Sequence, residues 1–153
     1  LNSSRPDQDS GEVGYRQRLW MKECLDKYPD RVKIVALHHH LLPVPDTGME
    51  KNIISDAGDV LWSLISHGAD LVLCGHRHRP WVWSMGKMNI FYAGTVSTNR
   101  LRGFYKNSYN IIEIKNGGIQ ASLKIVGGKE FALNPKTIKT LKIPEQPMTE
   151  CIL

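Results

Sequence analysis

The sequence lacks any long apolar run: nowhere in its 153 residues do roughly 20 consecutive apolar residues occur, the length that a membrane-spanning helix needs. It also lacks the basic and then apolar start of a secretory signal peptide. Its three cysteines, Cys24, Cys74 and Cys151, are widely spaced and form no C-x-x-C pair, so no disulfide framework is expected. We therefore expect a chain without a membrane partner, in a reducing, cytoplasmic setting.

Acidic residues are fewer than basic ones: 15 Asp and Glu stand against 20 Lys and Arg, which gives a formal net charge of +5. Such a charge is compatible with a nucleic-acid partner but does not by itself favour one. Hydrophobic residues make up 41% of the chain, which is sufficient at this length for one core. The composition therefore indicates a chain of single-domain length.

The first part of the chain predicts a loop followed by a helix. Residues 2–10 are polar and turn-forming, which is typical of a loop. Apolar residues then recur near helical spacing from Glu12 to about Tyr28, with Ser10 placed to cap the first turn. We expect Trp20 to pack in the core.

A strand, a helix and a second strand follow. Residues 31–37 and 71–73 are short apolar runs typical of strands. Between them, apolar residues from Ile53 to His67 repeat at i, i+3, i+4 and i+7, which predicts an amphipathic helix. Gly68 suits the left-handed position just past its end. Parallel strands need such a crossover, and it is right-handed by default.

Histidines follow both strands. His38, His39 and His40 come after the first, and His76 and His78 come after the second, beyond Cys74 and the flexible Gly75. On an extended chain, residues i and i+2 face the same way, so His76 and His78 are expected to converge. The carboxyl ends of neighbouring parallel strands meet at one edge of a sheet.

We therefore predict a metal site formed by His76, His78 and one imidazole of the run His38, His39 and His40. The other two of that run are expected to support or pack against the site, and His67, at the end of the predicted helix, is expected to be structural. Two alternatives stay open. Three imidazoles can make a mononuclear zinc site with an open fourth position for water, or the histidines are incidental in a non-enzymatic basic binding module.

Three segments, ALHHHLLPVP, ADLVLCGHRHRP and FYAGTVSTNRLRG, resemble the C-terminal half of the calcineurin-like metallophosphoesterases, especially the branch of cyclic-nucleotide and glycerol phosphodiesterases. The resemblance runs from about Asn2 to about Val126. It implies a mixed α/β fold, a two-sheet β-sandwich flanked by helices, that hydrolyses phosphomonoesters or phosphodiesters with two divalent metal ions (Mn, Fe or Zn). It also implies that His38 and His76 share one ion while His78 binds the other.

The N-terminal motifs of that family, D-x-H, G-D-x-x-D and G-N-H, are absent before His38. Gly58 and Asp59 spell GD, but Trp62 stands where the second aspartate belongs, so we interpret them as unrelated. The resemblance implies that this chain supplies histidine ligands only, that its partner is the missing N-terminal segment of the same domain, and that the chain alone is inactive. Loss of aspartate-rich motifs also explains the basic charge better than a nucleic-acid partner does.

The remaining segments complete the expected fold. Residues 81–84 and 88–93 predict one β-hairpin and residues 109–115 and 119–126 a second. The loop 41–52 is expected on the surface over the strand ends. We assign residues 1–126 to the C-terminal part of a metallophosphoesterase domain and 127–153 to an irregular basic tail. Four arginines are candidate phosphate ligands, or part of a solvated basic surface: Arg77, Arg79, Arg100 and Arg102.

Overall fold

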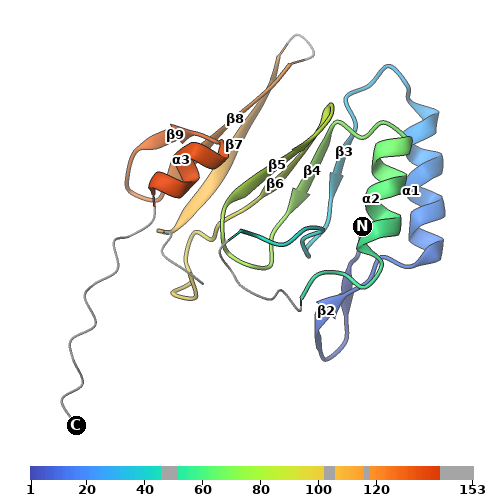
Figure 1. Cartoon of the computed structure of the whole chain (residues 1–153), viewed down its shortest axis with the longest axis horizontal. Coiled ribbons are helices and arrows are strands. Elements are labelled where there is room, and N and C mark those ends of the chain that lie inside the picture. The colour runs from blue at the N-terminus through green and yellow to red at the C-terminus, as the bar shows by residue number, and fades with distance from the viewer. Residues whose placement is uncertain (46–51, 102–105, 116–117, 142–153) are drawn as a thin grey trace.

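The computed structural model describes residues 1–45, 52–101, 106–115 and 118–141. A four-stranded sheet lies at its centre (Figure 1), with the strand order β3-β4-β6-β5. Its strands are β3 (Ile34–Ala36), β4 (Leu71–Cys74), β5 (Trp81–Met85) and β6 (Met88–Tyr92). The first three strands in this order are parallel and β5 is antiparallel to β6. The carboxyl ends of β3 and β4 therefore meet at one edge.

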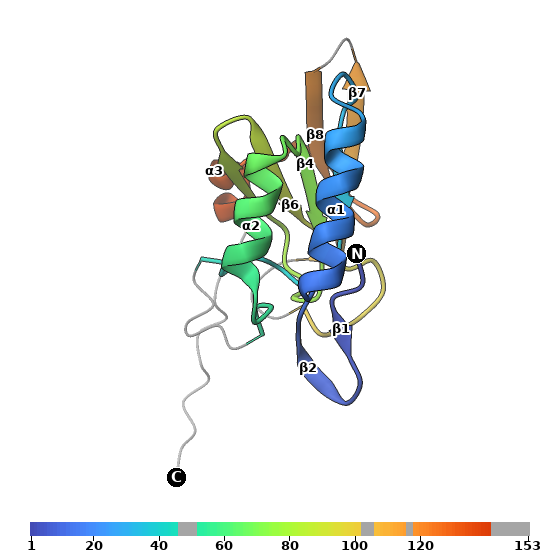
Figure 2. The same cartoon turned by 90° about the vertical axis from the view of Figure 1, so that its right-hand side faces the viewer.

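Layers cover the two faces of this sheet. Helices α1 (Tyr15–Lys27) and α2 (Ala57–Ser66) lie side by side on one face (Figures 1 and 2). A three-stranded sheet and the short helix α3 (Pro135–Thr140) lie beyond the other face. The strands of that sheet are β7 (Ser108–Lys115), β8 (Gly118–Ile125) and β9 (Glu130–Ala132). The predicted mixed α/β fold with two larger sheets is confirmed.

The unit β3, α2, β4 follows the sequence prediction closely. β3 and β4 pair in parallel, with Ile34 opposite Leu71 and Ala36 opposite Leu73. Val60 and Leu64 of α2 are fully buried, as the apolar period predicts. Gly68 has a φ of 68° and ends the helix as expected. The two predicted hairpins are also confirmed by the pairing of β5 with β6 and of β7 with β8.

The prediction of a loop over residues 2–10 is wrong. These residues form an antiparallel hairpin of β1 (Ser4–Arg5) and β2 (Gln8–Gly11). Strands this short carry no readable period, so their pairing depends on distant contacts. Gly11 shows one of them, because a Cβ there would collide with the Ser3 carbonyl and the His39 imidazole. The hairpin is therefore fitted against the histidine segment.

The start of α1 also differs from the prediction. Gly14, with a φ of 78°, precedes the first helical residue, and Ser10 lies in β2 instead of capping the helix. The Asp56 carboxylate accepts hydrogen bonds from the backbone N–H groups of Val13 (3.0 Å) and Gly14 (2.8 Å) and from the Arg18 guanidinium (2.6 Å). A side chain 38 residues away from Arg18 in sequence thus fixes the start of this helix.

Replacing Asp56 by alanine is expected to lower the free energy of unfolding at pH 7 by about 2–4 kcal/mol, because buried donors lose their acceptor. Burial raises the pKa of Asp56, but the donors from Val13, Gly14 and Arg18 more than offset this, so its pKa lies below the ordinary value. This stabilisation is therefore complete above the ordinary pKa and is lost as the pH falls through the lower folded value.

Urea unfolding at several pH values measures both effects. Asp59→Ala is the matched control, because Asp59 also contacts Arg18 (3.1 Å) but its side chain is 69% exposed, so we expect a loss of about 0.5 kcal/mol or less. Equal losses for the two variants, or a gap between Asp56→Ala and the parent chain that widens in acid, would contradict this account.

Two further predictions are corrected. Trp20 is 58% exposed, and the buried residues of α1 are its neighbours Met21 and Leu25. The tail expected to be irregular contains β9 and α3 within its described part. The side chain of Asn134 accepts the Thr137 N–H (2.9 Å) ahead of Pro135, a helix-start pattern present in the sequence, and Ile138 of α3 is fully buried. The domain boundary after residue 126 stays a prediction.

Within the described ranges, no helix combines the length and the apolar character that spanning a membrane requires.

Candidate metal centre

The candidate site lies where β3 and β4 end. The ladder between the strands continues past their last residues: the Leu37 N–H bonds to the Leu73 carbonyl oxygen (3.0 Å) and the Gly75 N–H to the His38 carbonyl oxygen (2.9 Å). This pairing holds the backbone of His38 next to the residue before His76. Two histidines that are 38 residues apart in sequence are therefore brought together by the parallel register.

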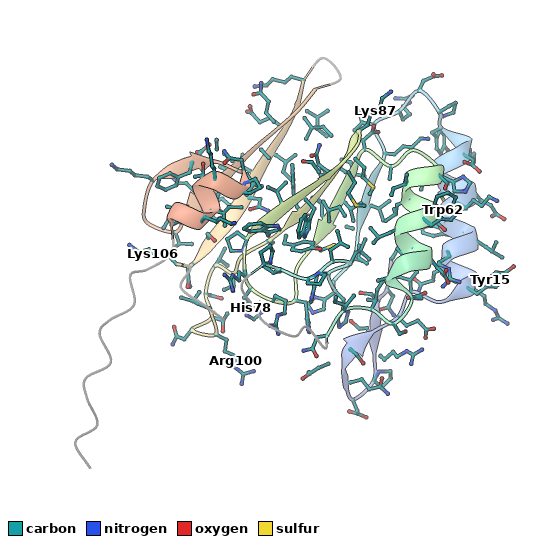
Figure 3. The ribbon with its side chains drawn as sticks, viewed as in Figure 1. Tyr15, Trp62, His78, Lys87, Arg100 and Lys106 are labelled. Atoms are coloured by element: carbon teal, nitrogen blue, oxygen red, sulfur yellow. The ribbon has the colours of Figure 1, made fainter. Side chains whose placement is uncertain are left out.

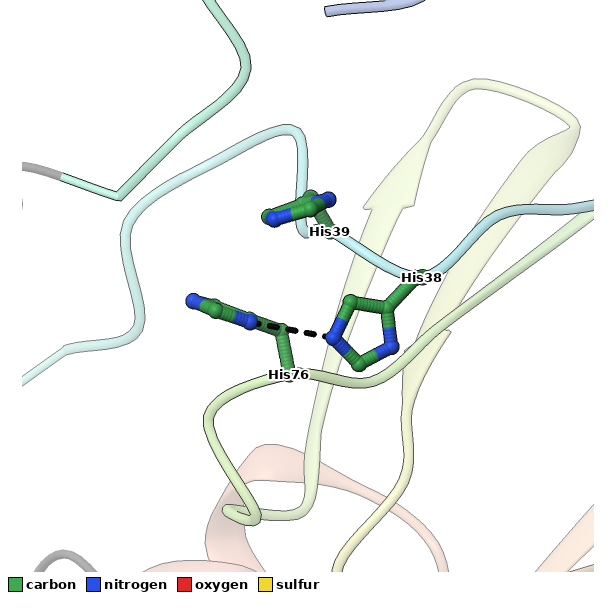
Figure 4. Close-up of side chains that lie close together, drawn as sticks. All are labelled: His38, His39 and His76. Carbon is green, nitrogen blue, oxygen red and sulfur yellow. Dashed lines mark hydrogen bonds between the residues drawn. The ribbon is translucent and has the colours of Figure 1, made fainter. Parts of the chain in front are cut away.

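Three imidazoles gather at this point (Figure 4). Nε2 of His38 lies 3.1 Å from Nδ1 of His76. The His39 ring lies 4.5 Å from the His76 ring and 4.9 Å from the His38 ring, measured between centroids. One ring nitrogen from each of these residues falls within 4.8 Å of the others, a spacing that a single metal ion can span. We call His38, His39 and His76 the histidine cluster.

The closest pair fits a shared metal ligand set. Nitrogen ligands of zinc lie about 2.0–2.1 Å from the ion in tetrahedral geometry, so two of them are about 3.3 Å apart. The separation of 3.1 Å between His38 Nε2 and His76 Nδ1 is close to that value. Imidazole nitrogen is also a donor that zinc, iron and manganese all accept. The geometry and the chemistry of this pair therefore suit a divalent transition metal.

His39 is held differently from its two neighbours. It is 2% exposed, its Nε2–H donates to the Asp9 carbonyl oxygen (3.2 Å), and its Nδ1 accepts from the Ser3 hydroxyl (3.0 Å). Burial and the nearby His38 lower the pKa of His39, and Asp9 partly opposes them. Both ring nitrogens are thus engaged by the β1-β2 segment, which favours a supporting role and matches the sequence prediction.

His40 supports the cluster by stacking on the His76 ring. Its ring is fully buried and stacks on His76, with centroids 6.0 Å apart and planes 20° apart. The Tyr92 ring meets His40 edge-on at 5.9 Å, and the Tyr92 hydroxyl donates to the Leu42 carbonyl oxygen and accepts the Leu42 N–H, both at 2.9 Å. A fixed aromatic stack therefore restricts the orientation of the His76 imidazole.

His76 and His78 do not converge in the way that an extended chain would predict. These residues are not extended: His76 has a φ of 68° and His78 a φ of 54°, both in the left-handed region. Positive φ is uncommon for residues other than glycine and often accompanies functional sites. His78 lies outside the histidine cluster, and its Nδ1–H donates to the Arg100 carbonyl oxygen at 3.0 Å (Figure 3). Its assignment to a second ion stays a prediction.

Two neighbours of the cluster also differ from expectation. The loop predicted on the surface begins with buried residues, since Leu41 and Val44 are 1% and 2% exposed, while residues 46–51 lie outside the described part. Arg79 is 4% exposed, so it does not contribute to a solvated basic surface, and Arg100 is exposed. Arg102 lies outside the described residues, and a phosphate role for the arginines stays a prediction.

Carboxylates and thiolates are not part of the cluster. Among the described residues, the group whose ligand atoms converge contains imidazoles only. Cys74 is the last residue of β4, but burial raises the pKa of its thiol to about 12, so it is protonated at neutral pH. A thiol in that state is a poor nucleophile and a poor metal ligand. The histidine cluster therefore offers imidazole donors only.

Two curated proteins are similar to this chain in sequence. The chain is 32% identical over 81 residues to a probable cyclic nucleotide phosphodiesterase of Psychrobacter, covering 52% of this chain and 23% of that protein. It is 31% identical over 71 residues to the 3′,5′-cyclic adenosine monophosphate phosphodiesterase CpdA of Escherichia coli K12, covering 45% of this chain and 26% of CpdA. Both relatives are named as cyclic nucleotide phosphodiesterases, which supports the resemblance to the calcineurin-like metallophosphoesterases over the part of the chain that they match.

The chain spans about a quarter of the length of the curated relatives that it matches. No protein-family model matches it. Among solved structures, it is similar to a predicted phosphoesterase from Streptococcus pneumoniae, with 17% identity over 86% of this chain and 94% of that one. The TM-score of this comparison is 0.36.

Proposed function

We propose that this chain supplies the histidine ligands of a metal-dependent phosphoesterase centre that hydrolyses phosphodiesters or phosphomonoesters. The observation that carries the proposal is the approach of His38 Nε2 to His76 Nδ1 at the carboxyl ends of β3 and β4. Relatives named as cyclic nucleotide phosphodiesterases favour a phosphodiester substrate. The free thiols of Cys24 and Cys74 agree with a reducing, cytoplasmic setting.

Each residue of the site has a distinct task in this proposal. His38 and His76 hold the ion, while His39 and His40 fix the rings of the cluster through hydrogen bonds and stacking. A bound divalent ion lowers the pKa of water toward about 7 and offsets phosphoryl charge. Arg100, exposed beside His78, is placed to attract the anionic substrate.

A binuclear centre needs more than these residues provide. Two ions about 3.5–4 Å apart stabilise the attacking and the leaving oxygens, and such a pair needs a bridging ligand. Imidazole does not bridge in this way, and the histidine cluster includes no carboxylate. We therefore propose that the cluster holds one ion of a binuclear centre and that His78 binds the other once the bridging carboxylate is supplied.

The runner-up is a mononuclear zinc site built from all three residues of the cluster. It is favoured by the convergence of their ring nitrogens within 4.8 Å. It is disfavoured because coordination by His39 would displace either Ser3 or the Asp9 carbonyl from its ring.

Metal stoichiometry tests the proposal. We expect the purified chain to bind one zinc or manganese ion, with an affinity weaker than that of a complete tetrahedral site, because only two imidazoles of the cluster, those of His38 and His76, are proposed as ligands. Equilibrium dialysis followed by elemental analysis measures both numbers. One tightly bound zinc that is lost in His39→Ala would favour the mononuclear site, and a chain that binds no ion would exclude both.

A further inference from the structure

Tyr92 lies outside the histidine cluster but at the same edge of the sheet. It is the last residue of β6 and pairs in the parallel register with Cys74, the last residue of β4. On its other side it pairs with Trp81 of β5, and the Asn110 side chain donates to its carbonyl oxygen (3.2 Å). Only 1% of Tyr92 is exposed. A residue so confined on an inner strand provides a fixed point beside the cluster.

The Tyr92 hydroxyl holds the chain segment that follows β3. It donates to the Leu42 carbonyl oxygen and accepts the Leu42 N–H, both at 2.9 Å. Residues 37–45 belong to no helix or strand, so their backbone polar groups depend on contacts from other segments. His38 lies four residues before Leu42 on this segment. The hydroxyl therefore restrains the backbone that carries one of the two proposed ligands.

The Tyr92 ring reaches the second proposed ligand. It meets the His40 ring edge-on, with centroids 5.9 Å apart, and His40 in turn stacks on the His76 ring at 6.0 Å. Nδ1 of His76 lies 3.1 Å from Nε2 of His38 (Figure 4). Both residues of this pair are thus backed by contacts that end at Tyr92. Because metal ligands need to be held within about 0.5 Å of their productive geometry, small movements of the segment or of the His40 ring would weaken the site.

The chemistry of the Tyr92 side chain distinguishes positioning from packing. A buried hydroxyl costs free energy unless it is hydrogen-bonded, so phenylalanine or leucine would fill a core position of this kind at lower cost. The Tyr92 hydroxyl both gives and receives a hydrogen bond on the same residue, Leu42. The hydroxyl thus serves the segment that carries His38 and not the core around it.

We infer that Tyr92 is a positioning residue, which fixes His38 and His76 relative to each other through the backbone of Leu42 and through the ring of His40. The inference rests on the proposed function for the identity of the two ligands. The restraint itself depends only on contacts that the metal-free chain makes.

Tyr92→Phe tests the restraint, because it removes the hydroxyl and keeps the ring. We expect its zinc affinity to be about tenfold lower than that of the parent chain, an effect typical of residues that support metal ligands. We also expect the absorption bands of the cobalt(II)-loaded chain to change in position and intensity, because they report the coordination geometry. Tyr92→Leu, which also removes the ring contact with His40, is expected to lose more affinity.

Two control variants separate positioning from a general loss of stability. Tyr109→Phe makes the same chemical change at a residue of β7 that is 42% exposed. Leu64→Val thins the core near the start of β4, since the Leu64 carbonyl oxygen accepts the Ala69 N–H, whereas His76 follows the end of β4. We expect both controls to bind zinc within about twofold of the parent chain and to keep its cobalt spectrum. Equal losses for Leu64→Val and Tyr92→Phe would overturn the inference.

Measurements on the metal-free chain distinguish this inference from the proposed function. Nuclear Overhauser contacts between the ring protons of His40 and His76 report the stack, and we expect them to weaken in Tyr92→Phe but not in Tyr109→Phe. If the parent chain binds zinc and Tyr92→Phe keeps its affinity and spectrum, the inference is wrong and the proposed function stands. If the parent chain binds no zinc, the proposed function is wrong and the ring contacts alone decide the inference, since their persistence in Tyr92→Phe would refute it.

Discussion

Replacement of His76 by alanine is expected to lower zinc affinity by about 100-fold or more, because it removes one of the two closest ring nitrogens in the cluster. His38→Ala should have an effect of similar size, and the double variant little more, since a pair of ligands acts as a unit. Competition with a chromophoric zinc chelator, or isothermal titration calorimetry, measures these affinities.

The control for this experiment is His67→Ala. His67 directly follows the last residue of α2 and precedes β4, whereas His76 of the cluster follows β4. The Nδ1 atom of His67 bonds to the Asp26 carboxylate (2.6 Å). We expect its removal to reduce stability slightly and to leave zinc affinity within about twofold of the parent value. Equal losses of affinity for His67→Ala and His76→Ala would show that zinc binds nonspecifically to surface histidines and not at the histidine cluster.

Hydrolysis of 3′,5′-cyclic adenosine monophosphate by the purified chain, with manganese or zinc present, is expected to be at least about 1000-fold slower than hydrolysis by the phosphodiesterase CpdA of Escherichia coli. The physical reason is the absence of a carboxylate from the cluster, which leaves no bridge for a second ion. Initial rates across a range of metal concentrations measure the difference.

His76→Ala is also the control for the activity measurement. Any residual rate that belongs to this chain should fall further in the variant, while a contaminating phosphatase would be unaffected. Turnover comparable to that of CpdA, abolished by His76→Ala, would contradict the requirement for a carboxylate from outside the histidine cluster. The mononuclear zinc site would then be the better account.

The meeting of His38 and His76 could be predicted from the sequence because it follows from local rules. Two short apolar runs flank a strongly periodic helix, which predicts parallel neighbours, and residues just past their carboxyl ends must then share an edge. The structure shows this approach directly. Their service as metal ligands stays a prediction that the two experiments above test.

The placement of His78 could not be predicted because it depends on backbone conformation beyond the strand. The i, i+2 rule holds only for an extended chain, and the left-handed φ values of His76 and His78 break it. The residue types do not predict these positive φ values, because residues other than glycine adopt a positive φ only where surrounding contacts fix it. The Arg100 carbonyl that receives His78 is one such contact, and it comes from a distant loop.

Trp20 illustrates a different limit. Its apolar side chain suggests core packing, and the apolar period of α1 does not show which element covers each side of the helix. Met21 and Leu25 are buried, whereas Trp20 is 58% exposed and lines a cavity beside β3. The packing of α1 on the sheet, which the apolar period does not give, decides which of these side chains is buried.

Anomalous X-ray scattering from a crystal of the zinc-loaded chain tests the central claim most directly. We expect one strong zinc peak about 2.0–2.1 Å from both His38 Nε2 and His76 Nδ1. A peak bound elsewhere, or zinc held by only one of these two nitrogens, would contradict it.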